Sequence, residues 1–565
     1  MFPTSRKEMD ALGWDAPDVI LFTGDAFIDH PAFGAAVIAR VLESRGYNVA
    51  VVPQPNWRDD LRDFKKLGAP KLFFGVTSGA MDSMVNHYTA AKRLRSNDAY
   101  TPEGRAGQRP DRAVTVYSNI LKQLFPEVPL VIGGIEASLR RLTHYDYWDD
   151  CLKPSVLVDS KADFLVYGMG ERPIVSIADS LAAGYSLDNI AWMPQIATLR
   201  KTAPSGGIHM HSFEECRKDG RAFVENFNVI EREANKMHPV MLVEPVADGF
   251  VVVNPPYPPA TSREMDAIYA LPFTKLPHPR YKGKRIPAYD MIKFSITTHR
   301  GCFGGCNFCT IAAHQGKFIQ SRTPESIVRE AEGLLKLEEF RGNISDLGAP
   351  TANMYRLGGK DRTLCDTCAR QSCLFPKRCQ NLSTSHDEVL DLYRKVLAVK
   401  GIRHAYVGSG IRYDLFLDSD GFMDESGRKY LHELVTRHTS GRLKVAPEHT
   451  EERVLQVMGK PSFSLFERLR HEFDLIILKE GLKYQLVPYF ISGHPGCRMD
   501  DMKALSENPA LDGLYMEQVQ DFTPTPMTTS SVAYWTGIDP RTGRKVFVER
   551  DIEKKQRQKS YFFNK

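Results

Sequence analysis

Cysteines are the residues of this chain whose type and spacing most directly indicate chemistry. Seven of the ten cysteines fall between residues 302 and 379, in two separate groups. The first group lies in the stretch THRGCFGGCNFCTIAAHQGK and consists of Cys302, Cys306 and Cys309. Thiolates bind iron–sulfur clusters and zinc, whereas disulfides are rare in reducing compartments. The clustering therefore predicts a metal centre.

The spacing of this first group favours an iron–sulfur cluster with one open iron. A cuboidal four-iron cluster ordinarily takes four thiolates, and the C-x3-C-x2-C pattern supplies three. Glycines at 301, 304 and 305 allow the backbone to wrap closely around such a cluster. The alternative is a structural zinc site with His299 or His314 as the fourth ligand. Structural zinc usually takes two well-separated pairs of ligands, and the pattern here does not pair in that way.

The second group predicts a second metal centre. It has the pattern C-x2-C-x4-C-x5-C and consists of Cys365, Cys368, Cys373 and Cys379. Four soft ligands in one short segment can surround either a second iron–sulfur cluster or zinc. Four unligated thiols are the remaining alternative. The pattern leaves the identity of the metal open.

The elements that must position these cysteines begin with an N-terminal sheet. Five short apolar runs alternate with helix-like segments in the first 190 residues: DVILFTGDAF, YNVAVV, PKLFFGVTSG, VPLVIGGIEAS and ADFLVYGMGE. Continuous apolar runs of this kind are typical of parallel strands buried on both faces. We predict an α/β fold with a doubly wound parallel sheet over residues 1–190. Its ligands are expected beyond the carboxyl ends of the strands.

The rest of the chain predicts a connector, a partial barrel and a tail. Residues 191–287 are less regular and include the proline-rich passage VVVNPPYPPA. Residues 288–540 repeat six strand–helix units, which predicts a parallel barrel or partial barrel whose chemistry lies at the carboxyl ends of its strands. The three-cysteine loop follows the first of these strands, and residues 365–379 form an insertion after the second. Residues 541–565 carry mixed charge and are predicted to be a solvated end.

Composition excludes several classes of protein. With 565 residues, 42% hydrophobic and 25% charged, the chain is too long for one core and has the make-up of a globular protein rather than a disordered or fibrous one. The net charge of +5 makes nucleic acid a possible partner that no strongly basic domain supports. The N-terminus lacks the apolar core of a secretory signal, and the chain lacks an apolar run long enough to span a membrane. We therefore predict a cytoplasmic protein without a membrane partner.

The C-x3-C-x2-C loop after the first strand of a βα barrel resembles the signature of the radical S-adenosylmethionine enzymes. Over nearly its whole length the chain resembles the YgiQ family of these proteins, of the UPF0313 type, through the stretches GDAFIDHPAFGAAVIARVLE, GGIEASLRRLTHYDYWDD, CARQSCLFPKRCQNL and VAPEHT. The resemblance implies a [4Fe-4S] cluster on Cys302, Cys306 and Cys309, with S-adenosylmethionine on the open iron. Reductive cleavage would then give a 5′-deoxyadenosyl radical that acts on an unknown substrate, by methyl transfer, sulfur transfer or another reaction.

The resemblance also implies residues around S-adenosylmethionine. The turn SDLGAPTANMY resembles the glycine-rich turn that receives the methionyl amine, with Gly348-Ala349-Pro350 in place of the usual Gly-Gly-Glu. Ser409, Arg412 and Glu448 follow later strands and are expected to contact the ribose or the carboxylate. Phe308 is expected to shield the cluster from solvent. The expected partner is an electron-donor protein of the flavodoxin or ferredoxin type.

A doubly wound sheet ahead of such a barrel resembles a cobalamin-binding domain, whose usual cobalt-ligating pattern is Asp-x-His-x-x-Gly. The stretch DHPAFG has Asp29 and Gly34 at that separation, but His30 stands one position early. Either cobalamin binds without a protein ligand, or the domain has kept the fold and changed its function. Asp29 is alternatively expected to cap the following helix.

A competing hypothesis from another class is a zinc-stabilised nucleic-acid-binding protein without catalysis, in which the basic tail contacts phosphates.

Overall fold

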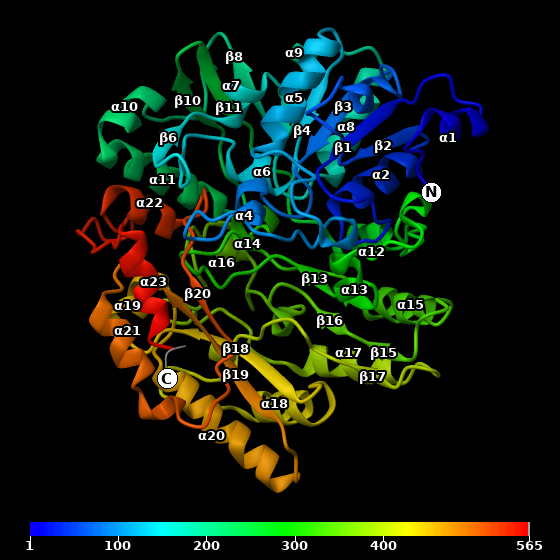
Figure 1. Cartoon of the computed structure of the whole chain (residues 1–565). Helices are drawn as coiled ribbons and strands as arrows, with labels where there is room; N and C mark the ends of the chain where they lie inside the picture. The colour runs from blue at the N-terminus through cyan, green and yellow to red at the C-terminus, as the bar shows by residue number, and fades with distance from the viewer. Residues whose placement is uncertain (563–565) are drawn as a thin grey trace.

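The chain forms two α/β regions that lie against each other (Figure 1). The computed structural model describes residues 1–562, apart from the side chain of Gln518. In Figure 1 the N-terminal region, coloured blue to green, occupies the upper half, and the region coloured green to red occupies the lower half. Among the described residues, no helix has both the length and the apolar character needed to cross a membrane.

The N-terminal region is built on a nine-stranded sheet with the strand order β2-β1-β3-β4-β7-β8-β11-β10-β9. Its first five strands are parallel and are the five that the apolar runs predict: β1 (Val19–Thr23), β2 (Val49–Pro53), β3 (Phe73–Thr77), β4 (Leu130–Ile132) and β7 (Phe164–Val166). The chain reverses direction across the sheet between β1 and β3, which is the topological switch point where doubly wound sheets bind ligands.

Both faces of this sheet are covered by helices, which confirms the predicted doubly wound arrangement. Val19 and Leu21 pack into one apolar cluster with α2 (Gly34–Ser44) and α8 (Glu171–Ala182). The alternate residues Ile20 and Phe22 pack into a second cluster with α5 (Ala113–Leu124). Because successive side chains of a strand point to opposite faces, a strand covered on both faces must be apolar throughout.

The predicted connector also contributes strands to this sheet. They are β8 (Ile196–Arg200), β9 (Ile208–His209), β10 (Leu242–Val246) and β11 (Gly249–Val253). β8 runs antiparallel to β7 and to β11, and β10 and β11 form a hairpin. The helix α11 (Gly220–Ala234) lies between β9 and β10 in the chain. The sheet therefore extends beyond the five predicted strands.

The C-terminal region is a partial barrel of parallel strand pairs, as predicted. The pairs are β12 (Ser295–Thr297) with β16 (Asp346–Gly348), β15 (Asn343–Ile344) with β17 (His404–Ala405), and the three-stranded unit β18 (Arg442–Glu448), β19 (Gln485–Ser492) and β20 (Gln518–Asp521). The helices between them include α15 (Pro324–Leu334), α17 (Asp387–Leu397), α18 (Glu425–Arg437) and α20 (Ser464–Lys479). Their apolar faces and the strands form one core of buried residues.

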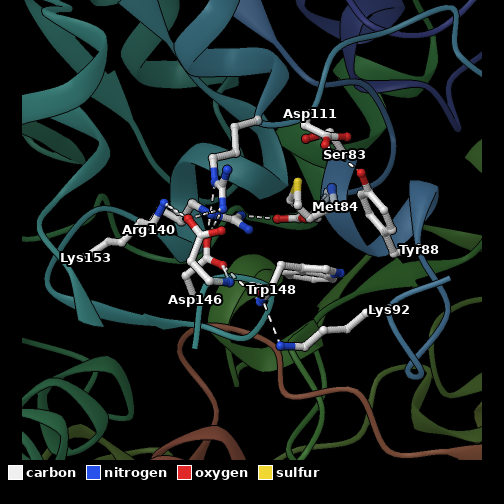
Figure 2. Close-up of polar contacts among 12 residues, drawn as sticks. Ser83, Met84, Tyr88, Lys92, Asp111, Arg140, Asp146, Trp148 and Lys153 are labelled. Carbon is white, nitrogen blue, oxygen red and sulfur yellow. Dashed lines mark hydrogen bonds and ion pairs between the residues drawn. The ribbon is translucent and has the colours of Figure 1, made fainter. Parts of the chain in front are cut away.

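The motif GGIEASLRRLTHYDYWDD braces the N-terminal region. It forms α6 (Gly134–Leu139) and the hairpin of β5 (His144–Asp146) and β6 (Cys151–Lys153). Arg140 pairs with Asp82, and Arg112 donates to Asp146 at 3.0 Å. Figure 2 shows Arg140 and Asp146 close together in this network. The carboxylates of Asp82 and Asp146 offset the charges of Arg140 and Arg112, so this motif has a structural explanation.

The charged tail packs on the barrel, whereas its composition predicts a solvated end. Helix α23 (Ile552–Ser560) lies beside β20 and α22 (Thr529–Thr536) in Figure 1. The side chain of Lys555 is buried and donates to the hydroxyls of Tyr147 and Tyr534 at 3.2 and 3.3 Å. Two aromatic rings can replace part of the hydration of an ammonium group, which a charge count along the sequence does not reveal.

Candidate functional site

The three-cysteine loop lies at the carboxyl end of β12. It is flanked by β13 (His299–Arg300) and α14 (Ile311–Gln315). The backbone N–H of Cys302 donates to Gly316 O at 3.1 Å, and that of Cys309 donates to Cys306 O at 3.1 Å. The Cys302 Sγ lies 3.5 Å from Thr351 Oγ1, in the turn that follows β16. The loop therefore closes on itself and faces the carboxyl end of the neighbouring strand.

Glycines let other groups of the protein approach this loop closely. Gly305 has a φ of +62°, and a Cβ there would lie 2.5 Å from Ser372 Cβ. A Cβ at Gly304 would lie 2.7 Å from the Arg412 guanidinium and 3.3 Å from Cys302 Sγ. Any other residue would push these groups away from the cysteines.

Burial and a nearby arginine set the electrostatics of the loop. All three cysteines are free thiols. Burial raises the pKa of Cys302, and burial with the neighbouring thiols raises that of Cys309 to about 12. Without a metal the thiols of Cys302 and Cys309 hold their protons, so loading a cluster must release them. Arg412 Nη1 donates to Cys306 Sγ at 3.0 Å and supplies a fixed positive charge.

Gly348 and Ser409 are brought together by Asp346, a residue that the sequence reasoning missed. Asp346 accepts from the backbone N–H groups of Gly408 and Ser409 at 2.9 and 3.1 Å, and from the Ser409 hydroxyl. A Cβ at Gly348 would lie 2.8 Å from both the Asp346 carboxylate and Ser409 Oγ. The sequence signal that could have found Asp346 is its position two residues before Gly348, at the end of a strand. The Ser409 hydroxyl therefore already has a protein partner.

The other predicted cofactor contacts also lie around the loop. Arg412 is held by Asp414 as well as contacting Cys306. Glu448 is buried, has a φ of +70° and lies 3.6 Å from Lys460 Nζ. The ring of Phe308 packs at a centroid distance of 6.0 Å from the ring of His494. That Gly348, Ser409, Arg412, Glu448 and Phe308 contact S-adenosylmethionine stays a prediction.

A cavity of about 530 Å³, which we call the interdomain pocket, lies between the two regions. Its walls come from the carboxyl ends of the N-terminal sheet and from those of β12 and β16: Thr77, Gly79, Gly133, Gly134, Gly168, Gly170, Thr297, His299, Gly348 and Ser409. Pockets of about 300–1,000 Å³ are typical of small-molecule and cofactor sites. The strand ends of both regions therefore face one space of cofactor size.

The end of β1, in contrast, is filled by protein. Arg109 Nη1 lies 3.0 Å from Asp25 Oδ1, and Asp25 accepts from the N–H of Ala80. Burial raises the pKa of Asp25 to about 6 despite this guanidinium. The pair is buried, so it closes this strand end.

Asp29 and His30, the residues that resemble the cobalamin-binding pattern, contact other groups of the protein. Asp29 pairs with Arg40 and does not cap α2, whose N-cap residue is Phe33; the expected cap is therefore wrong, because the buried arginine captures the carboxylate. His30 is buried, its Nδ1 accepts from Ala32 N, and it is not part of the wall of the interdomain pocket. His30 therefore does not line that pocket, whereas Pro31 and Ala32 do.

The two histidines of the zinc alternative differ in their availability. His299 bonds through Nδ1 to Thr298 Oγ1 at 2.9 Å and through Nε2 to Thr351 O at 3.1 Å. Both of its ring nitrogens are therefore occupied. His314 Nδ1 is buried without a partner, and its side chain lines the interdomain pocket.

The four-cysteine insertion lies directly against the three-cysteine loop. Cys373 N donates to Phe303 O at 3.0 Å, and Ser372 Oγ donates to Gly304 O at 2.7 Å. A cavity of about 500 Å³ is lined by its four cysteines, Cys365, Cys368, Cys373 and Cys379. Among residues 1–562, no three His, Cys, Asp or Glu side chains converge tightly enough for one metal ion. In a four-iron cluster each thiolate binds a different iron, which spaces the sulfurs more widely.

The comparisons with known proteins agree with this geometry. A family model described as Radical SAM N-terminal matches residues 1–295. A UPF0313 protein of Bacteroides thetaiotaomicron is 53% identical over 99% of this chain and 93% of its own length. A UPF0313 protein of Porphyromonas gingivalis is 51% identical over 99% of this chain and 90% of its own. The chain belongs to the UPF0313 family of radical SAM proteins.

The UPF0313 chain also shares a fold with a solved radical SAM enzyme. That structure is TsrM from Kitasatospora setae, a radical S-adenosylmethionine methyltransferase with cobalamin and a [4Fe-4S] cluster bound. The likeness has a TM-score of 0.51 at 14% identity and covers 91% of this chain and 74% of TsrM. It extends across both regions, and at this identity it concerns the fold alone. The UPF0313 relatives and the family model confirm the predicted resemblance to the UPF0313-type radical SAM family.

Proposed function

We propose that this protein reductively cleaves S-adenosylmethionine at a [4Fe-4S] cluster held by Cys302, Cys306 and Cys309. The observation that carries the proposal is the position of three partly buried free thiols on a glycine loop, at the carboxyl end of β12 and beside a cavity of cofactor size. A bound and reduced cluster would supply the electron that breaks the sulfur–C5′ bond, giving methionine and a 5′-deoxyadenosyl radical. The radical would take a hydrogen atom from a substrate whose identity stays open, as does any later methyl or sulfur transfer.

The chain's own residues would hold the reactants and exclude water. Arg412, fixed by Asp414, offsets the negative charge of the thiolates around Cys306. The turn at Gly348 offers a side-chain-free approach to the interdomain pocket for S-adenosylmethionine. Phe308 packs with His494 beside the cysteines and would shield the cluster from solvent.

The four-cysteine insertion is proposed to hold a second metal centre, either an iron–sulfur cluster or zinc. Its hydrogen bonds to Phe303 and Gly304 tie it to the first loop, so a redox-active centre there would lie on a short path to the first cluster. Four exposed cations lie along or just before this insertion, with the exposed acids Asp361 and Asp366 among them: Lys360, Arg362, Arg370 and Lys377. They suit an acidic electron-donor protein of the flavodoxin or ferredoxin type.

Cobalamin is a less supported cofactor for this chain. The residues at the cobalt-ligand position do not fit, because Asp29 is paired with Arg40 and His30 lies outside the interdomain pocket. A corrinoid in that pocket would need to bind without a ligand from His30. The proposed cleavage does not depend on it.

The deciding experiment is an assay for 5′-deoxyadenosine after anaerobic reconstitution with iron and sulfide. Wild-type protein with dithionite and S-adenosylmethionine should form it, and replacement of Cys302, Cys306 or Cys309 by Ala should abolish it. The competing nucleic-acid-binding hypothesis instead predicts a colourless zinc protein with salt-sensitive affinity for nucleic acid. Wild-type protein that holds a reducible cluster and still leaves S-adenosylmethionine intact would refute the proposal.

A further inference from the structure

A second large cavity lies beside the interdomain pocket. It measures about 740 Å³, and its walls come from the turn after β7, from α11 and the loop that follows, from the proline-rich passage and from the segment after the cysteine loop. We call it the connector cavity. Arg300 and His314 line both this cavity and the interdomain pocket. The two spaces therefore share a wall.

Arg141 reaches the wall of the connector cavity as a buried cation. Its residue is only 6% exposed, its Nη1 donates to Ser138 O at 2.7 Å, and its guanidinium lies 5.0 Å from the ring centroid of Tyr167. Its Nε is buried without a hydrogen-bond partner. Burying a charge is costly unless it is paired, so a guanidinium in this state is poised to receive an anion.

Lys317 is a second buried cation, and it lines both this cavity and the cavity of the four cysteines. It is 4% exposed, and its Nζ donates to the backbone carbonyl of Arg370. In the described part of the chain, no carboxylate lies within 4.0 Å of the charged nitrogens of Arg141 or Lys317. Glu231 interacts with the charges of both at longer range than an ion pair, and burial raises its pKa. Neither cation therefore has an ion-pair partner of its own.

The other cations of the cavity are already paired. Arg300 pairs with Glu171 at 2.5 Å, Lys236 pairs with Glu233 at 2.7 Å, and Arg172 pairs with Glu264. Carboxylates of the protein therefore neutralise these three cations, whereas Arg141 and Lys317 have no carboxylate at ion-pair distance.

The remaining walls are suited to an organic molecule rather than a bare ion. Pro255, Pro256 and Tyr257 supply a rigid apolar surface. On the side shared with the interdomain pocket, His314 Nδ1 is buried without a partner. A ligand with an acidic end and an apolar body would satisfy both kinds of wall.

We propose that the connector cavity binds a small organic molecule through an oxyanion, either carboxylate or phosphate, that Arg141 and Lys317 hold. A guanidinium fork is the group best matched to such an oxyanion, and an ammonium adds a second point of charge. The body of the ligand lies along the proline-rich wall. Its far end points to His314 and the interdomain pocket.

The test is isothermal titration of the full-length protein with inorganic phosphate and, separately, with succinate in low-salt buffer. Neither S-adenosylmethionine nor reductant is present, so the result does not depend on the proposed cleavage. The wild type should bind at least one probe, and Arg141→Gln should weaken it about tenfold or more, since each lost charge-assisted contact is strong in a buried site. Lys317→Gln should weaken it about threefold to tenfold. Tighter phosphate binding would identify a phosphorylated ligand, and tighter succinate binding would identify a carboxylic acid.

Arg172→Gln is the matched control, because Arg172 lines the same cavity but is paired with Glu264. Its affinity should stay within about twofold of the wild type. If Arg141→Gln does not fold, Lys317→Gln and Arg141→Lys decide, and affinities equal to the wild type in both would overturn the proposal. Binding of neither probe by the wild type, or equal loss in Arg172→Gln, would overturn it as well.

Discussion

The Nη1 of Arg412 lies 3.0 Å from the sulfur of Cys306, although the two residues are far apart in the sequence. The guanidinium is fixed on its other side by Asp414, to which Nε donates at 2.9 Å. Both partners of this ion pair are buried. A positive charge therefore stands at a set position beside one of the three proposed cluster ligands.

Removing this charge should make the cluster harder to reduce. Reduction adds an electron to the cluster, and a nearby cation stabilises the more negative state, most strongly where the site is buried. In Arg412→Gln we expect a lower reduction potential and about tenfold less 5′-deoxyadenosine at a fixed level of reductant, since a lost buried charge contact is worth on the order of 1–3 kcal/mol. A redox titration followed by electron paramagnetic resonance measures the potential.

Two further variants give this prediction its controls. Arg412→Lys keeps the charge and should shift the potential less than Arg412→Gln. Arg394→Gln removes an arginine at the surface, where Arg394 lies 3.4 Å from Glu433, and should leave the potential unchanged. An unchanged potential in Arg412→Gln with full iron content would show that the guanidinium has another role.

Gly305→Ala should loosen the loop and reduce its iron content. Gly305 combines a φ of +62° with a Cβ position 2.5 Å from Ser372 Cβ. The strain and the displaced insertion should together lower stability by about 1–3 kcal/mol. Iron and sulfide analysis after reconstitution, with the apparent Tm, would measure both effects.

Gly333→Ala is the matched control for the same substitution. Gly333 lies in α15, and a Cβ there would have no neighbour within 4 Å. Because alanine favours helix more than glycine, this variant should be more stable by about 0.5–1 kcal/mol. Equal iron loss in both variants would contradict the role assigned to Gly305.

The strands and the cysteine loop could be predicted because their signals are local. The run at residues 19–23 is apolar throughout, and the structure buries alternate residues of it against opposite layers of helices. The cysteines of the first group lie within eight residues of one another, so their convergence needs only one tight loop.

The partners of these residues could not be predicted, because the fold brings them from distant segments. Arg412 reaches Cys306 from 106 residues away, and Asp346 binds Ser409 from 63 residues away, through contacts that no local spacing encodes. Lys555 is a further example. Its charge predicts an exposed side chain, but in the structure it lies over the rings of two tyrosines. Pairing across long distances is decided by packing.

Glu244→Gln should remove a pH-dependent loss of stability. Glu244 is fully buried in β10, accepts from Thr143 N at 2.9 Å, and has a second carboxylate oxygen without a partner. Burial raises its pKa from 4.5 to about 7. A carboxyl group with a raised pKa favours the folded state when protonated, so its contribution is present below pH 4.5 and is lost as the pH rises to about 7.

This shift corresponds to a cost of up to about 3 kcal/mol above pH 7. The apparent Tm of Glu244→Gln should therefore exceed that of the wild type by more at pH 8 than at pH 5. Thermal scans at both pH values measure the difference. Glu339→Gln, at a side chain that is 70% exposed, should show the same difference from the wild type at both values. A constant difference for Glu244→Gln would show that this carboxyl group ionises normally in the fold.

Cys379→Ser should remove one metal centre while sparing the cleavage of S-adenosylmethionine by chemical reductant. Cys379 lines the cavity of the second group, and that group touches the first loop through backbone and hydroxyl contacts without sharing its cysteines. Metal analysis should show the loss of the second centre, and 5′-deoxyadenosine with dithionite should stay within about twofold of the wild type, since the first site keeps its ligands. With a flavodoxin or ferredoxin as donor, the same variant should be slower if the second centre delivers electrons.

Cys151→Ser, at a cysteine outside both groups, should change neither metal content nor rate. Loss of cleavage with dithionite in Cys379→Ser would show that both groups form a single centre.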